Sequence, residues 1–280
     1  EAFIDMIDMS STVSTFTHIR PRPEMYYRSL TGTTAFTTVN VNYDLTDNVR
    51  FTSDLRYTKR DSNRQIAGYP TQSTAIAAPM SIDSYFNPTG GTSAVNWRRR
   101  GWEVPRTTDS SQTTWRFTAA LEGSFDIGER YFDWDVGYLY NENDLTIINN
   151  GNFYIPNVRQ AVGPSFLNTT TGQVQCGTAA APIALTSCVP WNPFAGFGTG
   201  AVANSLDDEA VRKFLFKQEH ALGNTQTTSY FANLAGSLFT LPAGDLSFAV
   251  GYEYRKEEGA FTPDAIAQSG NSTNLASGPT

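Results

Sequence analysis

The chain has 280 residues, a net charge of -7 and 13% aromatic residues. The negative net charge argues against nucleic-acid binding, because phosphate contacts require a basic surface. No run approaches the roughly 18 apolar residues of a transmembrane helix, whereas a transmembrane strand needs only about 9–11 residues, half of them polar. Glu1 follows no basic and apolar leader, so any secretion signal is expected to have been removed or to lie outside this sequence.

Residues 1–30 show no sustained period, and the Arg-Pro-Arg-Pro run at 20–23 is incompatible with an inner strand. We expect a loop here, with a short strand over 12–19. A hairpin then follows at about 33–58, where apolar and polar residues alternate on both sides of a turn at 46–48. In that hairpin Asp44 and Arg50 should face each other as a cross-strand ion pair.

Residues 59–110 read as a long loop rich in glycine, proline, serine and threonine. It contains the cluster WRRRGW at 97–102. One interpretation is a solvated patch that stabilises the loop. The other is contact with an anionic or sugar ligand, because arginine binds carboxylate or phosphate with a planar fork and tryptophan stacks on flat groups. The ligand-contact hypothesis covers Trp97, Arg98, Arg100, Trp102 and, from the next loop, Trp191.

The most regular hairpin is predicted at about 112–145, with a break at 128–130. A second long loop follows at about 147–225. It holds Cys176 and Cys188, which we expect to form one disulfide in an oxidising compartment. Within it, the capping-box pattern from Ser205 to Asp208 predicts a short helix that ends near 220–223.

The third hairpin is predicted at about 227–256 and a loop at 257–280, so that short connections alternate with long ones along the chain. A soluble β-sandwich would also show two-faced strands, but its strands are usually about 5–6 residues long. Short turns, long loops and long strands with one apolar face are typical of an outer-membrane barrel. The fold class we predict is therefore all-β: a transmembrane antiparallel up-and-down β-barrel with long extracellular loops and one short loop helix.

The two faces of these strands are assigned by alternation. The polar residues should face a water-filled lumen, and they are Arg50, Asp54, Arg56, Arg116, Glu122, Asp133, Asp135, Glu253 and Arg255. The apolar residues should face lipid, and they are Val39, Val41, Leu55, Trp115, Phe117, Leu121, Trp134, Val136, Tyr138, Leu234, Leu238, Phe248, Val250 and Tyr252. Tyrosines at the loop-side strand ends, such as Tyr57 and Tyr254, fit an interfacial girdle.

The six predicted strands cannot close such a barrel by themselves, and an open edge in hydrocarbon would leave backbone groups unpaired. We therefore interpret residues 1–280 as a single partial barrel domain, part of the wall of a larger barrel. Loops of this size favour a 22-stranded transporter with a plugged lumen.

The loop CVPWNPFAGFGTG (188–200), the helix SLDDEAVRKFLF (205–216) and the hairpin SLFTLPAGDLSFAVGYEYRKE (237–257) resemble the barrel of a proteobacterial TonB-dependent receptor. The likeness covers roughly residues 32–265, and the plug domain and closing strands of that family are absent. The resemblance implies a bacterial outer-membrane location, outer-membrane lipid as a partner, and uptake of a scarce nutrient powered by the TonB complex through a plug domain outside this chain. It does not choose between an oligosaccharide, a metal chelate and a peptide.

Other functions remain as alternatives: a passive porin, a soluble β-sandwich binding protein and, last, an outer-membrane enzyme barrel. Only His18 and His220 occur, neither in a metal-binding spacing, and no GxSxG motif is present. The paired carboxylates beside arginines read as solvated wall charges rather than acid–base catalysts. We therefore expect neither catalysis nor a metal or other cofactor.

Overall fold

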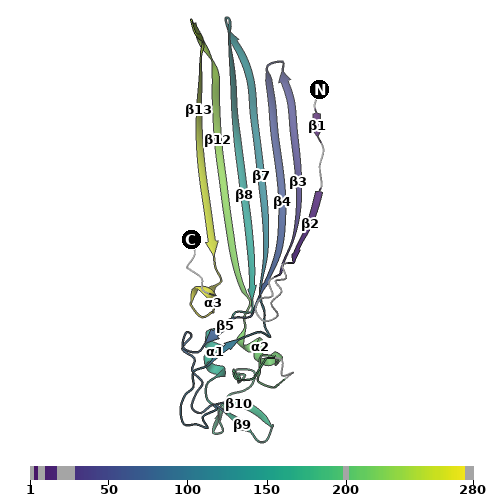
Figure 1. Ribbon diagram of the computed structural model, residues 1–280. Coiled ribbons are helices and arrows are strands. Elements are labelled where there is room, and N and C mark those ends of the chain that lie inside the picture. Colours follow the sequence, from purple (N-terminus) through teal and green to yellow (C-terminus); the bar gives the residue numbers. More distant parts are fainter. Residues whose placement is uncertain (1–2, 6–9, 18–28, 198–201, 275–280) are drawn as a thin grey trace.

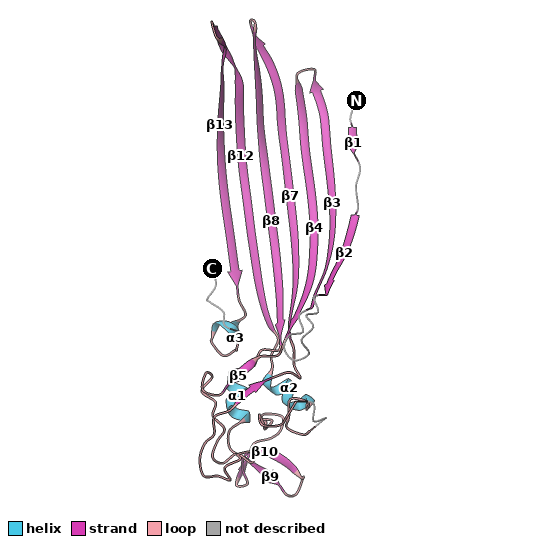
Figure 2. Ribbon diagram, viewed as in Figure 1, coloured by secondary structure: helices cyan, strands magenta, loops and turns pink. Residues whose placement is uncertain are grey.

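The computed structural model describes residues 3–5, 10–17, 29–197 and 202–274. Long antiparallel strands joined by tight turns dominate these residues (Figure 1 and Figure 2). They form a sheet of order β1-β3-β4-β7-β8-β12-β13, in which β2 also pairs with β3. The strands are β1 (Phe3–Asp5), β2 (Ser10–Thr17), β3 (Ser29–Thr46), β4 (Val49–Ile66), β7 (Arg106–Ile127), β8 (Arg130–Asn150), β12 (Glu219–Leu241) and β13 (Gly244–Thr262).

The antiparallel order confirms a mostly β fold and the three hairpins, but the described residues contain three short helices where the sequence predicts one. The sheet is not closed within the described residues, so a barrel of 22 strands is not observed. At the first turn, Asp44 and Arg50 are cross-strand partners, and Arg50 Nε donates to Asp44 Oδ1 at 2.8 Å. The predicted ion pair is therefore present.

The strands extend well beyond the predicted hairpins, which corrects the loop boundaries. β4 continues to Ile66 and β7 starts at Arg106, so the first long connection is 67–105 rather than 59–110. The second connection is 151–218 rather than 147–225, and β13 continues to Thr262. In these extensions polar residues occupy both faces, so backbone pairing persists without the alternation that reveals a strand in the sequence.

Glycines accept aromatic rings from neighbouring strands. A Cβ on Gly137 would lie 2.2 Å from Cζ of Phe231, its cross-strand partner, and a Cβ on Gly236 would lie 2.3 Å from Cδ1 of Phe132. Phe231 therefore lies on the polar face without interrupting the sheet. Phe239 breaks the alternation for another reason, since a register shift between Ser237 and Phe239 places it opposite Leu246 on the apolar face.

The long connections pack together into what we call the loop module, residues 67–105, 151–218 and 263–274, at one end of the sheet (Figure 1). The 198–201 segment lies outside the described residues. The elements of the loop module are β5 (Pro70–Gln72), β6 (Arg98–Arg100), α1 (Ile155–Ala161), β9 (Ser165–Asn168), β10 (Gln173–Thr178), β11 (Ala181–Pro182), α2 (Glu209–Leu215) and α3 (Ala265–Gln268).

The hydrophobic cluster of buried residues lies in the loop module and not on either face of the long sheet. It includes Met80, Trp97, Phe153, Trp191 and Leu215, each at most 3% exposed. A disulfide joins Cys176 on β10 to Cys188, as the sequence predicts. Among the described residues, no helix has the length and apolar character needed to cross a membrane.

The helix α2 is shorter than predicted. Its N-cap is Asp208, whose side chain accepts a hydrogen bond from the backbone N–H of Ala210 at 2.9 Å, rather than Ser205. Ser205 is buried, and its hydroxyl accepts from the N–H of Asp207 in the preceding turn. The helix ends at Leu215 because the residues from Glu219 onward already pair with β8.

Candidate functional site

One face of the long sheet carries an exposed band of apolar side chains. The register places Leu55 opposite Phe117, Leu121 opposite Val136 and Leu234 opposite Val250, so these side chains share the face predicted to be apolar. Trp115 is 43% exposed, Val250 58% and Tyr252 69%. A soluble sheet would bury such a face against a second layer. The described residues place no layer on it.

The height of this apolar band can be calculated from β7. Trp115 and Phe125, the first and last aromatic residues of the band on this strand, are ten residues apart, and Ile127 extends the apolar face by one further position. At about 3.4 Å per residue they are about 34 Å apart along the strand, and a tilt of 35–45° reduces this to about 24–28 Å. The apolar band of outer-membrane barrels is about 25 Å tall.

Aromatic rings mark the edge of the apolar band nearer the loop module. Tyr57 and Trp115 lie with ring centroids 4.5 Å apart, and Tyr230 lies 5.1 Å from Tyr138 and 6.4 Å from Tyr254. The sequence places Tyr57, Tyr138 and Tyr254 at strand ends, whereas the structure places them within β4, β8 and β13, because each strand continues past them in polar residues. The girdle is therefore an internal boundary of the sheet.

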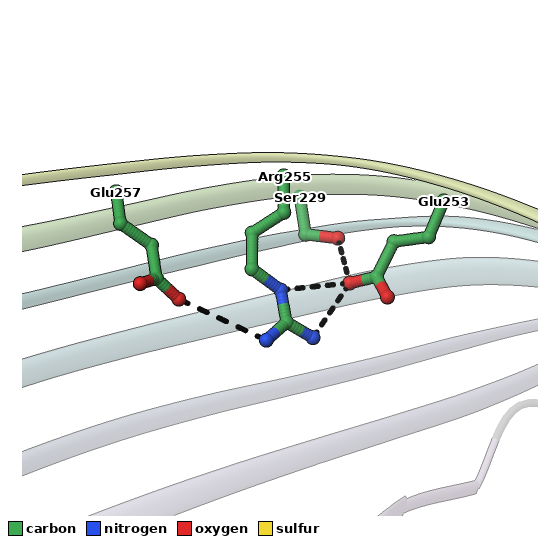
Figure 3. A network of polar contacts seen from close by, with 4 residues as sticks. All are labelled: Ser229, Glu253, Arg255 and Glu257. Carbon is green, nitrogen blue, oxygen red and sulfur yellow. Dashed lines mark hydrogen bonds and ion pairs between the residues drawn. The ribbon is translucent and has the colours of Figure 1, made fainter.

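The opposite face is polar and is crossed by ion pairs. Arg56 Nε lies 2.6 Å from Asp54 Oδ1. Figure 3 shows a larger network on β12 and β13, in which Glu253 accepts hydrogen bonds from Ser229 at 2.8 Å and from Arg255 at 2.7 and 2.9 Å. Arg255 also lies 3.7 Å from Glu257. All of the predicted polar-face residues share this face in the register.

Carboxylates gather at the turn end of the polar face. They line an open depression of about 640 Å³ together with Arg50 and Asn233. Asn233 donates to Asp135 at 2.8 Å, and Arg50 is held by Asp44. The residues that supply the negative charge are Asp44, Asp47, Glu122, Asp133 and Asp135.

The structure separates the predicted ligand-contact residues into two groups. Trp97 is 3% exposed and donates from Nε1 to the carbonyl of Ala78, and Trp191 is fully buried with its ring 5.0 Å from that of Trp97. Both belong to the core of the loop module. The hypothesis that they contact a ligand is therefore wrong, because they are sealed from solvent.

The remaining residues of that cluster lie at the surface of the loop module. Arg98 is exposed, and Trp102 is 36% exposed. The guanidinium of Arg100 lies 5.2 Å from the ring centroid of Trp102. The ring of Phe197, itself 61% exposed, lies with its centroid 6.4 Å from that of Trp102. Phe197 could not be found by sequence spacing, since it comes from another connection.

A second arginine–aromatic contact lies where the loop module meets the sheet. Arg106, the first residue of β7, has its guanidinium 5.3 Å from the ring centroid of Tyr69. The charges of Arg100 and Arg64 lie close enough to act on Arg106. Neither Arg64 nor Arg106 is singled out by a motif, because the pairing of β4 with β7 brings them together.

Within the described residues, no group of three or more histidine, cysteine, aspartate or glutamate side chains could hold a metal ion. His220 contacts Gln218 through Nε2, and His18 lies outside the described residues. Cys176 and Cys188 are consumed by the disulfide.

Several solved structures show a likeness to this chain. No family model and no curated protein matches the sequence. The siderophore receptor PiuA from Acinetobacter baumannii can be superposed with a TM-score of 0.32 and 13% identity over 85% of this chain. The match spans 31% of that receptor.

Proposed function

We propose that this sheet is part of the wall of a large outer-membrane β-barrel that takes up a nutrient. The observation that carries the proposal is the apolar band. It is exposed, about as tall as a bilayer core, bordered by aromatic rings, and opposite a face of ion pairs. Lipid is the solvent that such a face requires, because in water a contiguous apolar patch of this size favours aggregation.

The open edges of the sheet support a partial wall. β13 pairs only with β12 in the described residues, so its outer edge presents unpaired N–H and C=O groups. In hydrocarbon each unpaired group costs several kcal/mol, and only closure of the barrel removes them. The strands that complete the wall then belong to a longer protein or to further copies; we propose the former, with 22 strands in total.

Active uptake through a TonB-dependent receptor is the mechanism we favour within this class. The sequence resemblance supports it. The loop module also supports active uptake, because it has its own buried core and a disulfide. These features are expected of an ordered binding structure at the mouth of a pore and not of flexible connecting loops. In this proposal the module, with Arg98, Arg100 and Trp102 at its surface, captures the nutrient outside the cell.

Fluorescence quenching by brominated lipid tests the membrane assignment. In phosphatidylcholine vesicles, dibrominated chains should quench part of the emission of the intact protein, and the replacements Trp115→Phe and Trp134→Phe should remove most of the quenched part. Trp102→Phe is the matched control, because that residue lies in the loop module. Emission that brominated lipid leaves unchanged would sink the membrane proposal.

Liposome swelling separates uptake through a plugged receptor from a passive porin. Vesicles that contain the intact protein should not swell in arabinose if the lumen is plugged. Rapid swelling would favour the porin and contradict the receptor.

A further inference from the structure

Arginines line the polar face of the neighbouring strands β4 and β7 in a column. Arg56, Arg60 and Arg64 occur at every fourth position of β4, about 14 Å apart at 3.4 Å per residue, and residues at even spacing share a face. On β7, Arg116 is the direct partner of Arg56, and Arg106 is the partner of Ile66. We call these residues, Arg56, Arg60, Arg64, Arg106 and Arg116, the arginine column.

Most of the column lacks a neutralising carboxylate among the described residues. Within the described residues, Arg56 forms an ion pair with Asp54, but no ion pair joins Arg60, Arg64, Arg106 or Arg116 to a carboxylate. Two other arginines of the polar face are paired, Arg50 with Asp44 and Arg255 with Glu253. Because the chain is acidic overall, with a net charge of -7, the column is a local departure from its charge balance.

A bound anion would offset repulsion between the arginines of the column. Arg56 and Arg116 are directly opposite each other, and like charges in that position destabilise a sheet. At the loop end, Arg106 experiences the charges of Arg64 and of Arg100. The column thus leads from the middle of the polar face to the half-buried Arg100 and the exposed Trp102 and Phe197.

We infer that the arginine column is an anion-binding track for a solute that carries carboxylate or phosphate groups. The planar guanidinium fork of arginine binds both groups in a bidentate manner, and a basic groove raises the local concentration of anions. Carboxylates, Glu122 and Asp135 among them, lie at the turn end of the same face. Their negative charge would repel the anion and keep it in the half of the polar face nearer the loop module. The inference rests on the proposed function, because it requires the polar face to border a lumen.

Calorimetric titration of the intact protein in detergent tests the track. The probes are citrate, inorganic phosphate and, as a neutral solute, trehalose. We expect citrate or phosphate to bind, and the variant Arg60→Gln/Arg64→Gln/Arg116→Gln to bind about tenfold or more weakly, since each charge-assisted hydrogen bond contributes about one decade or more of affinity. The anion that binds more tightly, citrate or phosphate, identifies whether the ligand carries carboxylate or phosphate groups.

Arg255→Gln is the matched control, on the same face but held by Glu253 and Glu257. It should change anion affinity by about twofold or less, as for an exposed paired charge. The inference is overturned if neither anion binds, if the triple variant binds as the wild type does, or if Arg255→Gln loses as much affinity. If the polar face does not border a lumen, spin labels attached to that face would contact lipid. This separate measurement distinguishes failure of the proposed function from failure of the anion-binding inference.

Discussion

At the scale of single residues, glycines that receive aromatic rings determine how the strands fit together. Gly137 and Gly236 lie beneath Phe231 and Phe132, and Gly123 lies beneath Trp134. From the sequence these glycines look like interruptions of the strand pattern. Their role depends on the partner residue across the sheet, which the sequence of one strand does not reveal.

We predict that Gly137→Ala destabilises the sheet by about 1–3 kcal/mol, the usual cost of overpacking, because its Cβ would lie 2.2 Å from the Phe231 ring. The denaturant midpoint in detergent measures this. Gly259→Ala is the control, since its Cβ would make ordinary contact at 3.5 Å with Thr225 Cγ2. Equal stability of the two variants would refute the packing argument.

At the scale of elements, the sequence predicts the hairpins, their turns and both faces, because alternation is strong where one face is apolar. Beyond the aromatic edge it underestimates the strands, as between Lys59 and Ile66, where both faces are polar. The loop module is the larger omission. Trp97 and Trp191 look like exposed ligand contacts in sequence, and only the packing of distant connections reveals that they form its core.

The disulfide is expected to act on the loop module alone. Replacement of Cys176 and Cys188 by serine should lower the stability of the module by about 3 kcal/mol in the chain-entropy model, because the bridge closes a loop of 12 residues. Faster proteolysis within 165–191 would report the loss, while the sheet should stay resistant. Cleavage at the wild-type rate would contradict the prediction.

A charge placed in the apolar band should be far more harmful than one placed on the polar face. Val136→Arg, on a residue opposite Leu121 in the middle of the apolar band, should cost about 2–4 kcal/mol of stability in a bilayer. Asp133→Arg, three residues earlier on the polar face and near other carboxylates, is the control and should be tolerated. Reversible unfolding from vesicles compares the two variants.

At the scale of the whole molecule, the turns and the loop module lie at opposite ends of the sheet (Figure 1). An epitope inserted in the exposed turn Gly90–Gly91 should therefore bind antibody on intact cells. One inserted at Gly128–Glu129 should bind only after the outer membrane is permeabilised. Equal labelling of both on intact cells would contradict the transmembrane arrangement.

The membrane assignment depends most on which face of the sheet meets lipid. Spin labels placed one at a time along β8 from Tyr131 to Tyr140, in the intact protein in vesicles, measure this directly through collisions with oxygen and with a water-soluble nickel chelate. We predict that oxygen access peaks at Phe132, Trp134, Val136 and Tyr138, with nickel access peaking at the residues between them. Nickel access that is highest at the apolar positions, or that lacks a period of two, would contradict the proposal.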